Sequence, residues 1–189
     1  MRQNGNPRPN KIKMQKAIFL DRDGIINYPI IKHNKPFAPL EINEVKIIPN
    51  IHEVIKYFKM LKFKIFVITN QPDFVRGKTS KEKINKINIF LKDKLNIDEI
   101  YVCYHDNDDD CQCRKPKPGA FFYFQSKYSL DLSKSVMVGD RKSDIWAAKN
   151  AGCLSIFVDY DYNESKPNIQ TKTIFGINEL KNSLKELLE

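Results

Sequence analysis

Two carboxylates stand two residues apart in the run Asp21-Arg22-Asp23-Gly24. In an extended chain both side chains point to one side, and Gly24 allows the chain to turn behind them. Carboxylates this close repel each other unless a cation or a proton lies between them, and Mg²⁺ prefers oxygen ligands of this kind. Because surface loops often contain an Asp-x-Asp pair, this run alone does not establish a metal site.

Further polar residues could complete a site for phosphoryl transfer. Asp140 follows Gly139, and Asp144 lies about one helical turn later. Thr69 offers a hydroxyl group and Lys115 a fixed cation. Phosphoryl transfer needs a nucleophile in line with the leaving group, a metal ion, cations around the phosphoryl oxygens and an acid. Alone, Thr69 would be a turn residue and Lys115 a solvated lysine, so the hypothesis depends on their combination.

The apolar residues alternate between strand and helix patterns along the chain. Short apolar runs predict strands at 16–20, 64–69, 99–104, 135–138 and 154–158, and helical spacing or capping residues predict helices beginning at 51, 80, 118, 143 and 178. This alternation is typical of a Rossmann-like, doubly wound α/β fold, in which helices cover both faces of a parallel sheet. The candidate residues follow the first, second and fourth strands, at the edge where such sheets bind ligands.

Four segments resemble, in order, the four motifs of the haloacid dehalogenase superfamily: Asp21-Arg22-Asp23-Gly24, Thr69-Asn70-Gln71, Arg114-Lys115-Pro116 and Val138-Gly139-Asp140-Arg141-x-x-Asp144. The resemblance implies that Asp21 attacks phosphorus to form an aspartyl-phosphate, and that Asp23 serves as the acid and then as the base. It implies that Thr69 and Lys115 hold the phosphoryl oxygens. It also implies that Asp21, Asp23 and Asp140 bind a magnesium ion, and that Asp144 stabilises this site by supporting the ligands without binding the ion itself.

Three of the four cysteines share one loop with a histidine, in the pattern Cys103-x-His105-x5-Cys111-x-Cys113. In a cytoplasmic protein, where disulfides are rare, this spacing predicts a tetrahedral zinc site. Four protein ligands leave no open position, so we expect a structural zinc that holds Arg114 and Lys115 in place. The fourth cysteine, Cys153, is expected to be buried outside this site.

The cysteine loop narrows the resemblance to the family of heptose-bisphosphate and histidinol-phosphate phosphatases. This resemblance implies that there is no large cap domain and that a short segment from Ile25 to Pro39 covers the substrate. It implies hydrolysis of the 7-phosphate of a heptose 1,7-bisphosphate in nucleotide-activated heptose synthesis, with histidinol phosphate as the alternative substrate; the anomer is left open. The side chains expected to contact the substrate are Arg22, Asn27, Ile31, Lys32, Asn70, Gln71 and Arg114.

The 189 residues suffice for one well-buried domain, expected at 16–189 after a basic arm at 1–15. No apolar run approaches the roughly 20 residues of a membrane span, and the first residues lack the apolar core of a signal peptide. We therefore expect a cytoplasmic monomer that binds a small sugar bisphosphate and neither nucleic acid nor membrane. The net charge of +9 suits an anionic ligand, although dispersed lysines are also typical of a solvated surface. A zinc module that binds nucleic acid is a distant alternative, which leaves the ordered acidic motifs unexplained.

Overall fold

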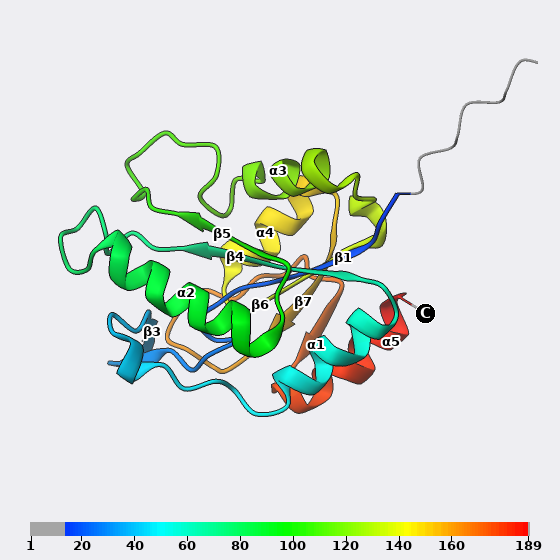
Figure 1. Cartoon of the computed structure of the whole chain (residues 1–189), viewed down its shortest axis with the longest axis horizontal. Helices are drawn as coiled ribbons and strands as arrows, with labels where there is room; N and C mark the ends of the chain where they lie inside the picture. The colour runs from blue at the N-terminus through cyan, green and yellow to red at the C-terminus, as the bar shows by residue number, and fades with distance from the viewer. Residues whose placement is uncertain (1–13, 189) are drawn as a thin grey trace, which may run out of the picture.

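Six parallel strands form the centre of the computed structural model, which describes residues 14–188 (Figure 1). In the order in which they lie across the sheet, the strands are β5 (Glu99–Cys103), β4 (Lys64–Asn70), β1 (Ala17–Leu20), β6 (Val136–Gly139), β7 (Leu154–Val158) and β8 (Lys172–Ile174). The predicted α/β fold is therefore confirmed. The edge strand β8 was not predicted, because it has only three residues and only Ile174 among them is buried.

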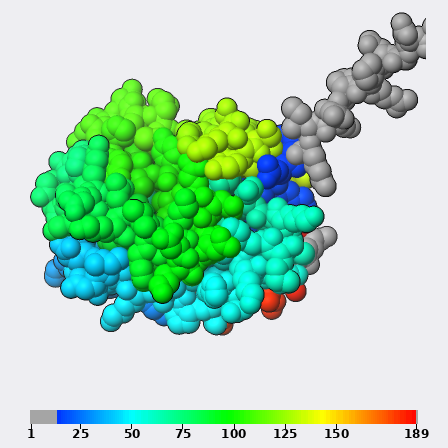
Figure 2. Space-filling model, viewed as in Figure 1, coloured from blue at the N-terminus to red at the C-terminus, as the bar shows by residue number. Residues whose placement is uncertain are grey.

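Helices cover both faces of this sheet. The α-helices are α1 (Ile51–Met60), α2 (Lys81–Leu95), α3 (Gly119–Tyr128), α4 (Lys142–Ala151) and α5 (Leu180–Leu188), and short 3₁₀ turns lie at Ile42–Glu44, Leu132–Lys134 and Ile177–Glu179. Side chains of α1, α2 and α5 pack on one face, and those of α3 and α4 on the other. Ser80 caps helix α2 as predicted, and its Oγ accepts a hydrogen bond from the Lys83 amide at 3.2 Å. In Figure 2 this green segment covers a large part of the face turned toward the viewer.

The central strand β1 is buried on both sides, as is typical of parallel sheets. Ile18 and Leu20 join the apolar cluster under α1, α2 and α5, whereas Phe19 points to the opposite cluster. There, the rings of Phe66 and Phe124 stack with 4.2 Å between their centroids. Burial of each such side chain contributes about 2 kcal/mol, so β1 is a rigid support for the residues that follow it.

The segment predicted to cover the substrate contains a hairpin. Strand β2 (Ile30–Lys32) pairs antiparallel with β3 (Lys35–Phe37), and both turn residues between them, His33 and Asn34, have positive φ angles. The main-chain carbonyl of Asn34 accepts a hydrogen bond from the Asn163 amide at 2.9 Å, so the turn is tied to the loop after β7. No large cap domain is present among residues 14–188, as expected.

Two further expectations concern the ends and surface of the chain. The basic arm predicted at 1–15 lies outside the described residues, except for Met14 and Gln15. The Gln15 amide donates to the Ser129 carbonyl at 3.0 Å, so the residue before the predicted start of the domain also pairs with it. In the described part of the chain, none of the helices has the length and apolar character that a bilayer crossing requires.

Candidate active site

The carboxyl ends of the central strands bring three carboxylates together. Asp21 directly follows β1, and its amide donates to the Val138 carbonyl of β6 at 2.9 Å. Asp140 directly follows β6, and Asp144 lies in the first turn of α4. One carboxylate oxygen from each of Asp21, Asp140 and Asp144 lies within 4.8 Å of the others. A cavity of about 690 Å³ opens at this edge, with Asp21 and Asp144 in its wall.

Lys115 supplies the cation of this cluster. Its Nζ lies 2.8 Å from Oδ1 of Asp21 and 2.6 Å from Oδ1 of Asp144, and it donates to the Ile68 carbonyl at 2.6 Å. The Lys115 side chain is almost fully buried. Burial acts to lower the pKa of Lys115, but the charges of Asp144 and Asp21 outweigh it and raise the pKa above its ordinary value. The ammonium group is therefore fixed and charged beside Asp21.

Asp140 has the character of a metal ligand. It is buried, and neither of its carboxylate oxygens accepts a hydrogen bond from the described residues. Burial, followed by the charges of Asp21 and Asp144, raises its pKa well above the ordinary value. Since a buried carboxylate without partners is costly, a divalent cation held by oxygen ligands fits this position.

Gly24 leaves the space that Asp140 occupies. A Cβ atom on Gly24 would lie 2.0 Å from Oδ2 of Asp140, and the φ angle of Gly24 is +102°. Only glycine combines this backbone conformation with such a close approach. The glycine turn expected after Asp21 and Asp23 therefore also leaves the space that Asp140 needs to join the cluster.

Asp21 carries a perturbed carboxyl group. Burial is the largest cause and raises its pKa to about 6; Lys115 opposes the rise, and Asp144 adds to it. Its Oδ1 is held by Lys115 and by the Arg22 amide at 2.7 Å. Its Oδ2 has no hydrogen-bond partner among residues 14–188, which leaves this oxygen available for a metal ion or for attack on an electrophile.

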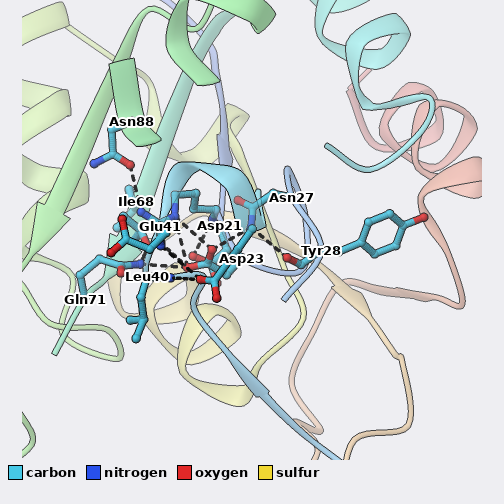
Figure 3. Close-up of polar contacts among 12 residues, drawn as sticks. Asp21, Asp23, Asn27, Tyr28, Leu40, Glu41, Ile68, Gln71 and Asn88 are labelled. Carbon is cyan, nitrogen blue, oxygen red and sulfur yellow. Dashed lines mark hydrogen bonds and ion pairs between the residues drawn. The ribbon is translucent and has the colours of Figure 1, made fainter. Parts of the chain in front are cut away.

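Asp23, which is expected to bind magnesium together with Asp21 and Asp140, has its carboxylate apart from theirs. This carboxylate is absent from the cluster of Asp21, Asp140 and Asp144 and is surrounded by donors instead (Figure 3). Asn27 Nδ2 donates to its Oδ1 at 2.9 Å, and Gln71 Nε2 donates to its Oδ2 at 2.9 Å. Asp23 still lines the cavity, which suits an acid or base better than a side-chain metal ligand.

Two residues expected to contact the substrate are buried beneath the site. Arg22 is fully buried, and its Nη2 donates to Oδ2 of Asp23 at 2.9 Å. Asn27 is also fully buried, and its amide nitrogen is shared between Asp23 and the Tyr28 carbonyl. In this structure both side chains hold Asp23, and neither reaches the cavity wall. A contact of Arg22 or Asn27 with the substrate therefore stays a prediction.

Two amide side chains, Asn70 at the end of β4 and Gln71 directly after it, have different roles in the structure. Gln71 is buried, and its Nε2 also donates to Oγ1 of Thr69 at 2.8 Å, so it supports Thr69 and Asp23 and does not line the cavity. Asn70 does line the cavity. Its amide group bonds the main chain of Lys115 in both directions, each at 3.1 Å. Asn70 thereby connects the end of β4 to the loop that carries the lysine.

The hairpin faces the cavity through its second strand. Ile31 and Lys32, predicted to contact substrate, are exposed on β2 and do not line the cavity, whereas Lys35 and Phe37 on β3 do. The turn at 33–34, which was not foreseen, therefore places β3 at the cavity, and the contacts of Ile31 and Lys32 with substrate stay predictions. Arg114, also predicted to contact substrate, lines the cavity, and its Nη2 donates to Oδ1 of Asn107 at 2.8 Å. Three further cations in the wall were not predicted, namely Arg76, Arg141 and Lys142.

The predicted cysteine and histidine residues meet in one cluster. Cys113 Sγ lies 3.3 Å from Cys103 Sγ and 3.4 Å from His105 Nδ1, and Cys103 Sγ lies 3.9 Å from Cys111 Sγ. All four cysteines have free thiols, and Cys153 is partly buried outside this cluster. One ligand atom from each of the four clustered residues lies within 4.8 Å of the others, an arrangement that can bind a metal ion.

Known proteins resemble this chain in sequence and in structure. Residues 25–152 match the family model of haloacid dehalogenase-like hydrolases. The D-glycero-beta-D-manno-heptose-1,7-bisphosphate 7-phosphatase of Helicobacter pylori is 34% identical over 142 residues, which cover 72% of this chain and 79% of that protein. The D-glycero-alpha-D-manno-heptose-1,7-bisphosphate 7-phosphatase of Photorhabdus laumondii is 33% identical over 187 residues, covering 90% and 97%.

Two other comparisons bear on the alternatives. The crystal structure of D,D-heptose 1.7-bisphosphate phosphatase from B. bronchiseptica, complexed with magnesium and phosphate, has a TM-score of 0.77 and is 26% identical, covering 91% of this chain and 99% of that chain. The histidine biosynthesis bifunctional protein of Blochmanniella floridana is 35% identical over 147 residues, covering 75% of this chain and 40% of that protein.

Proposed function

Because this chain belongs to the haloacid dehalogenase-like hydrolases, we propose that it is a magnesium-dependent phosphatase that removes the 7-phosphate of D-glycero-D-manno-heptose 1,7-bisphosphate. The observation that carries the proposal is the pairing of Asp21 with Lys115, 2.8 Å apart in the cavity wall, together with the unpartnered carboxylate of Asp140 in the same cluster. The relatives that carry this name support the substrate, and the geometry supports the reaction.

Asp21 acts as the nucleophile in this proposal. Lys115 and the Arg22 amide fix Oδ1, so Oδ2 attacks phosphorus while the bond from phosphorus to the sugar oxygen breaks. Asp23 gives its proton to that sugar oxygen. Water then attacks the aspartyl-phosphate and loses a proton to Asp23, and the carboxylate of Asp21 and inorganic phosphate are released. Lys115 and Thr69 hold the phosphoryl oxygens during both steps.

Magnesium fits the acidic end of the site. Asp21 and Asp140 would hold it, and when bound it supplies positive charge against the phosphoryl oxygens. Asp144 is assigned a supporting role, because both of its oxygens already have partners: Oδ1 lies by Lys115, and Oδ2 accepts from the Arg141 amide at 3.0 Å. Asp23 contributes its carboxylate to proton transfer only.

Zinc is proposed for the cluster of Cys103, His105, Cys111 and Cys113. In a tetrahedron with ordinary zinc bond lengths, two sulfurs lie about 3.8 Å apart and a sulfur and a nitrogen about 3.6 Å apart. The observed separations of 3.3 to 3.9 Å are close to these edges. Since Arg114 follows Cys113 directly and its Nη1 donates to the His105 carbonyl at 3.0 Å, the zinc would fix Arg114 at the cavity.

Substrate contacts are proposed for Asn70 and Arg114, which line the cavity, with Arg114 on the second phosphate or the hydroxyl groups. Histidinol phosphate is the second candidate substrate, because the Blochmanniella protein matches nearly as well over a smaller share of its own length. The proposal also includes a monomeric state and a cytoplasmic location, in a pathway that supplies activated heptose for lipopolysaccharide or another surface glycan.

The test is phosphate release by the purified protein with Mg²⁺ on a panel of substrates. The panel contains both anomers of the heptose 1,7-bisphosphate, fructose 1,6-bisphosphate and histidinol phosphate. We expect the highest kcat/KM on one of the heptose anomers, with one phosphate released per molecule. Preferential hydrolysis of histidinol phosphate would select the second candidate.

A further inference from the structure

Asn88 places a polar amide in the apolar stripe of α2. The stripe consists of Ile84, Ile87, Leu91 and Leu95, and Asn88 is buried among them at 7% exposure. Its Oδ1 accepts a hydrogen bond from Nη1 of Arg22 at 3.1 Å, and Figure 3 shows this amide turned toward the group around Asp23. A buried amide on an apolar helix face is costly unless it is paired, so its role lies in what it binds.

Arg22 passes this contact on to Asp23. Its guanidinium is fully buried; Nε donates to Oδ1 of Asp23 at 3.1 Å and Nη2 donates to Oδ2 at 2.9 Å. Such a two-point bond fixes the plane of a carboxylate as well as its position. Asn88 binds the remaining terminal nitrogen, so the guanidinium is held on the side opposite to Asp23.

We propose that Asn88 is a positioning residue for proton transfer, which orients Asp23 through Arg22. This inference rests on the proposed roles of Asp21 and Asp23. The Asp23 side chain is 14% exposed and lines the cavity, so its orientation determines where its proton points. Asn88 does not line the cavity, and its replacement should therefore lower kcat without weakening the binding of substrate.

The two half-reactions give a readout that a purely structural role would not move. With 4-nitrophenyl phosphate, the bond from Asp21 to phosphorus forms as 4-nitrophenolate leaves, and this weakly basic group needs no proton from Asp23. Hydrolysis of the aspartyl-phosphate still requires Asp23 to accept a proton from water. Loss of Asp23 orientation should therefore slow the second step and spare the first.

The experiment is rapid-mixing kinetics of Asn88→Leu with 4-nitrophenyl phosphate and Mg²⁺. Leucine has the same branched arrangement of heavy atoms but cannot accept the hydrogen bond from Arg22. We expect a nitrophenolate burst at nearly the wild-type rate, followed by steady-state turnover reduced about tenfold, a part of the usual contribution of general acid–base catalysis. Asn88→Asp keeps an acceptor oxygen opposite Nη1 and should restore most of the turnover. If Asn88→Leu does not fold, Asn88→Ala, which leaves room for water at Nη1, takes its place.

Leu91→Ala is the matched control, because Leu91 is fully buried on the same helix but has no polar group that could bind Arg22. It should lower the melting temperature and leave the ratio of burst to turnover at the wild-type value. An Asn88→Leu protein with unchanged turnover, or with burst and turnover reduced equally, would overturn the inference. The assay uses no sugar, so this outcome does not depend on the natural substrate. Failure of the proposed substrate would instead be seen in the substrate panel, as a wild-type protein that does not prefer a heptose bisphosphate.

Discussion

Nζ of Lys115 and Oδ1 of Asp21 lie 2.8 Å apart in a pocket where both side chains are largely buried. The pair joins the loop after the cysteine cluster to the end of the central strand. A buried ion pair of this kind is weak support for stability, but removal of one partner leaves the other charge uncompensated. The pair is therefore better explained by its proposed role in catalysis than by a contribution to stability. A substitution at Asp21 should separate activity from folding.

Asp21→Asn should abolish turnover while the fold persists. The substitution keeps the shape of the side chain but removes the nucleophilic carboxylate, so kcat should fall at least about a thousandfold. Phosphate release and circular dichroism measure the two properties. Asp93→Asn on the exposed face of α2 is the control and should remain fully active. Substantial turnover by Asp21→Asn would contradict the assignment of the nucleophile.

Lys115→Met should lower both activity and stability. It leaves the carboxylates of Asp21 and Asp144 close together without their cation, at a cost of about 3 kcal/mol in the free energy of unfolding. Denaturant unfolding without metal measures this loss, and added Mg²⁺ should recover part of it. Lys117→Met changes a nearby, partly exposed lysine that pairs with Asp110, and should leave stability within about 0.5 kcal/mol. Equal stability of the two variants would contradict the expectation.

The stability of the metal-free protein should fall as the pH rises through about 6. Burial raises the pKa of Asp21 to about 6, and burial also raises the pKa of Asp140. Between about pH 4 and pH 6 the folded state therefore binds more protons than the unfolded state. The contribution of these groups is thus complete at low pH and is lost above pH 6. Magnesium requires the ionised carboxylates, so its affinity should rise over the same interval.

Thermal unfolding from pH 5 to pH 8, with and without MgCl₂, measures this linkage. The increase in melting temperature caused by Mg²⁺ should be larger at pH 8 than at pH 5. In Asp140→Asn the increase should be small at both pH 5 and pH 8. The difference between the wild-type protein and this variant then reports the metal site alone and not the other titrating groups. A magnesium effect that is independent of pH in the wild-type protein would argue against these pKa shifts.

Removal of zinc should lower the melting temperature and the turnover together. The cluster of Cys103, His105, Cys111 and Cys113 precedes Arg114 and Lys115 directly, so its loss would release both cations from their places. One equivalent of zinc per chain is expected by elemental analysis. After chelation, Zn²⁺ should restore activity and Mg²⁺ alone should not.

Cysteine variants provide the control for this prediction. Cys111→Ser removes one ligand and should reduce the bound zinc, whereas Cys153→Ser changes a thiol outside the cluster and should retain it. A protein without zinc that keeps full stability and turnover would show that the cluster has another purpose.

The positions of the main chemical groups could be predicted because parallel strands place their carboxyl ends at one edge. Asp21, Thr69 and Asp140 each stand at such an end, so their proximity follows from the alternation of strands and helices. The cysteine cluster was predictable from spacing within one loop. Both predictions depend on local patterns and on a sheet topology with few alternatives.

The supporting residues could not be predicted in this way. A lone arginine next to a nucleophile would ordinarily face the solvent or the substrate, and burial of Arg22 is favourable only because Asp23 and Asn88 meet it in three dimensions. Asn88 gave one signal, a polar residue between Ile87 and Ile89 at a position where the helical spacing expects an apolar one. The hairpin turn at His33 and Asn34 gave no comparable signal, since neither residue is glycine.

The edge strand β8 and helix α5 contribute no residue to the cavity wall, yet Ile174, Leu180 and Leu184 lie in the large apolar cluster under the sheet. A nonsense mutation that stopped the chain before β8 would preserve every proposed catalytic and metal-binding residue and remove this packing. In a genetic screen, such an allele should behave as a null and yield aggregated product, whereas an Asp21 missense allele should accumulate as folded protein. Measurements of both protein abundance and activity would therefore distinguish mutations that remove catalysis from mutations that prevent folding.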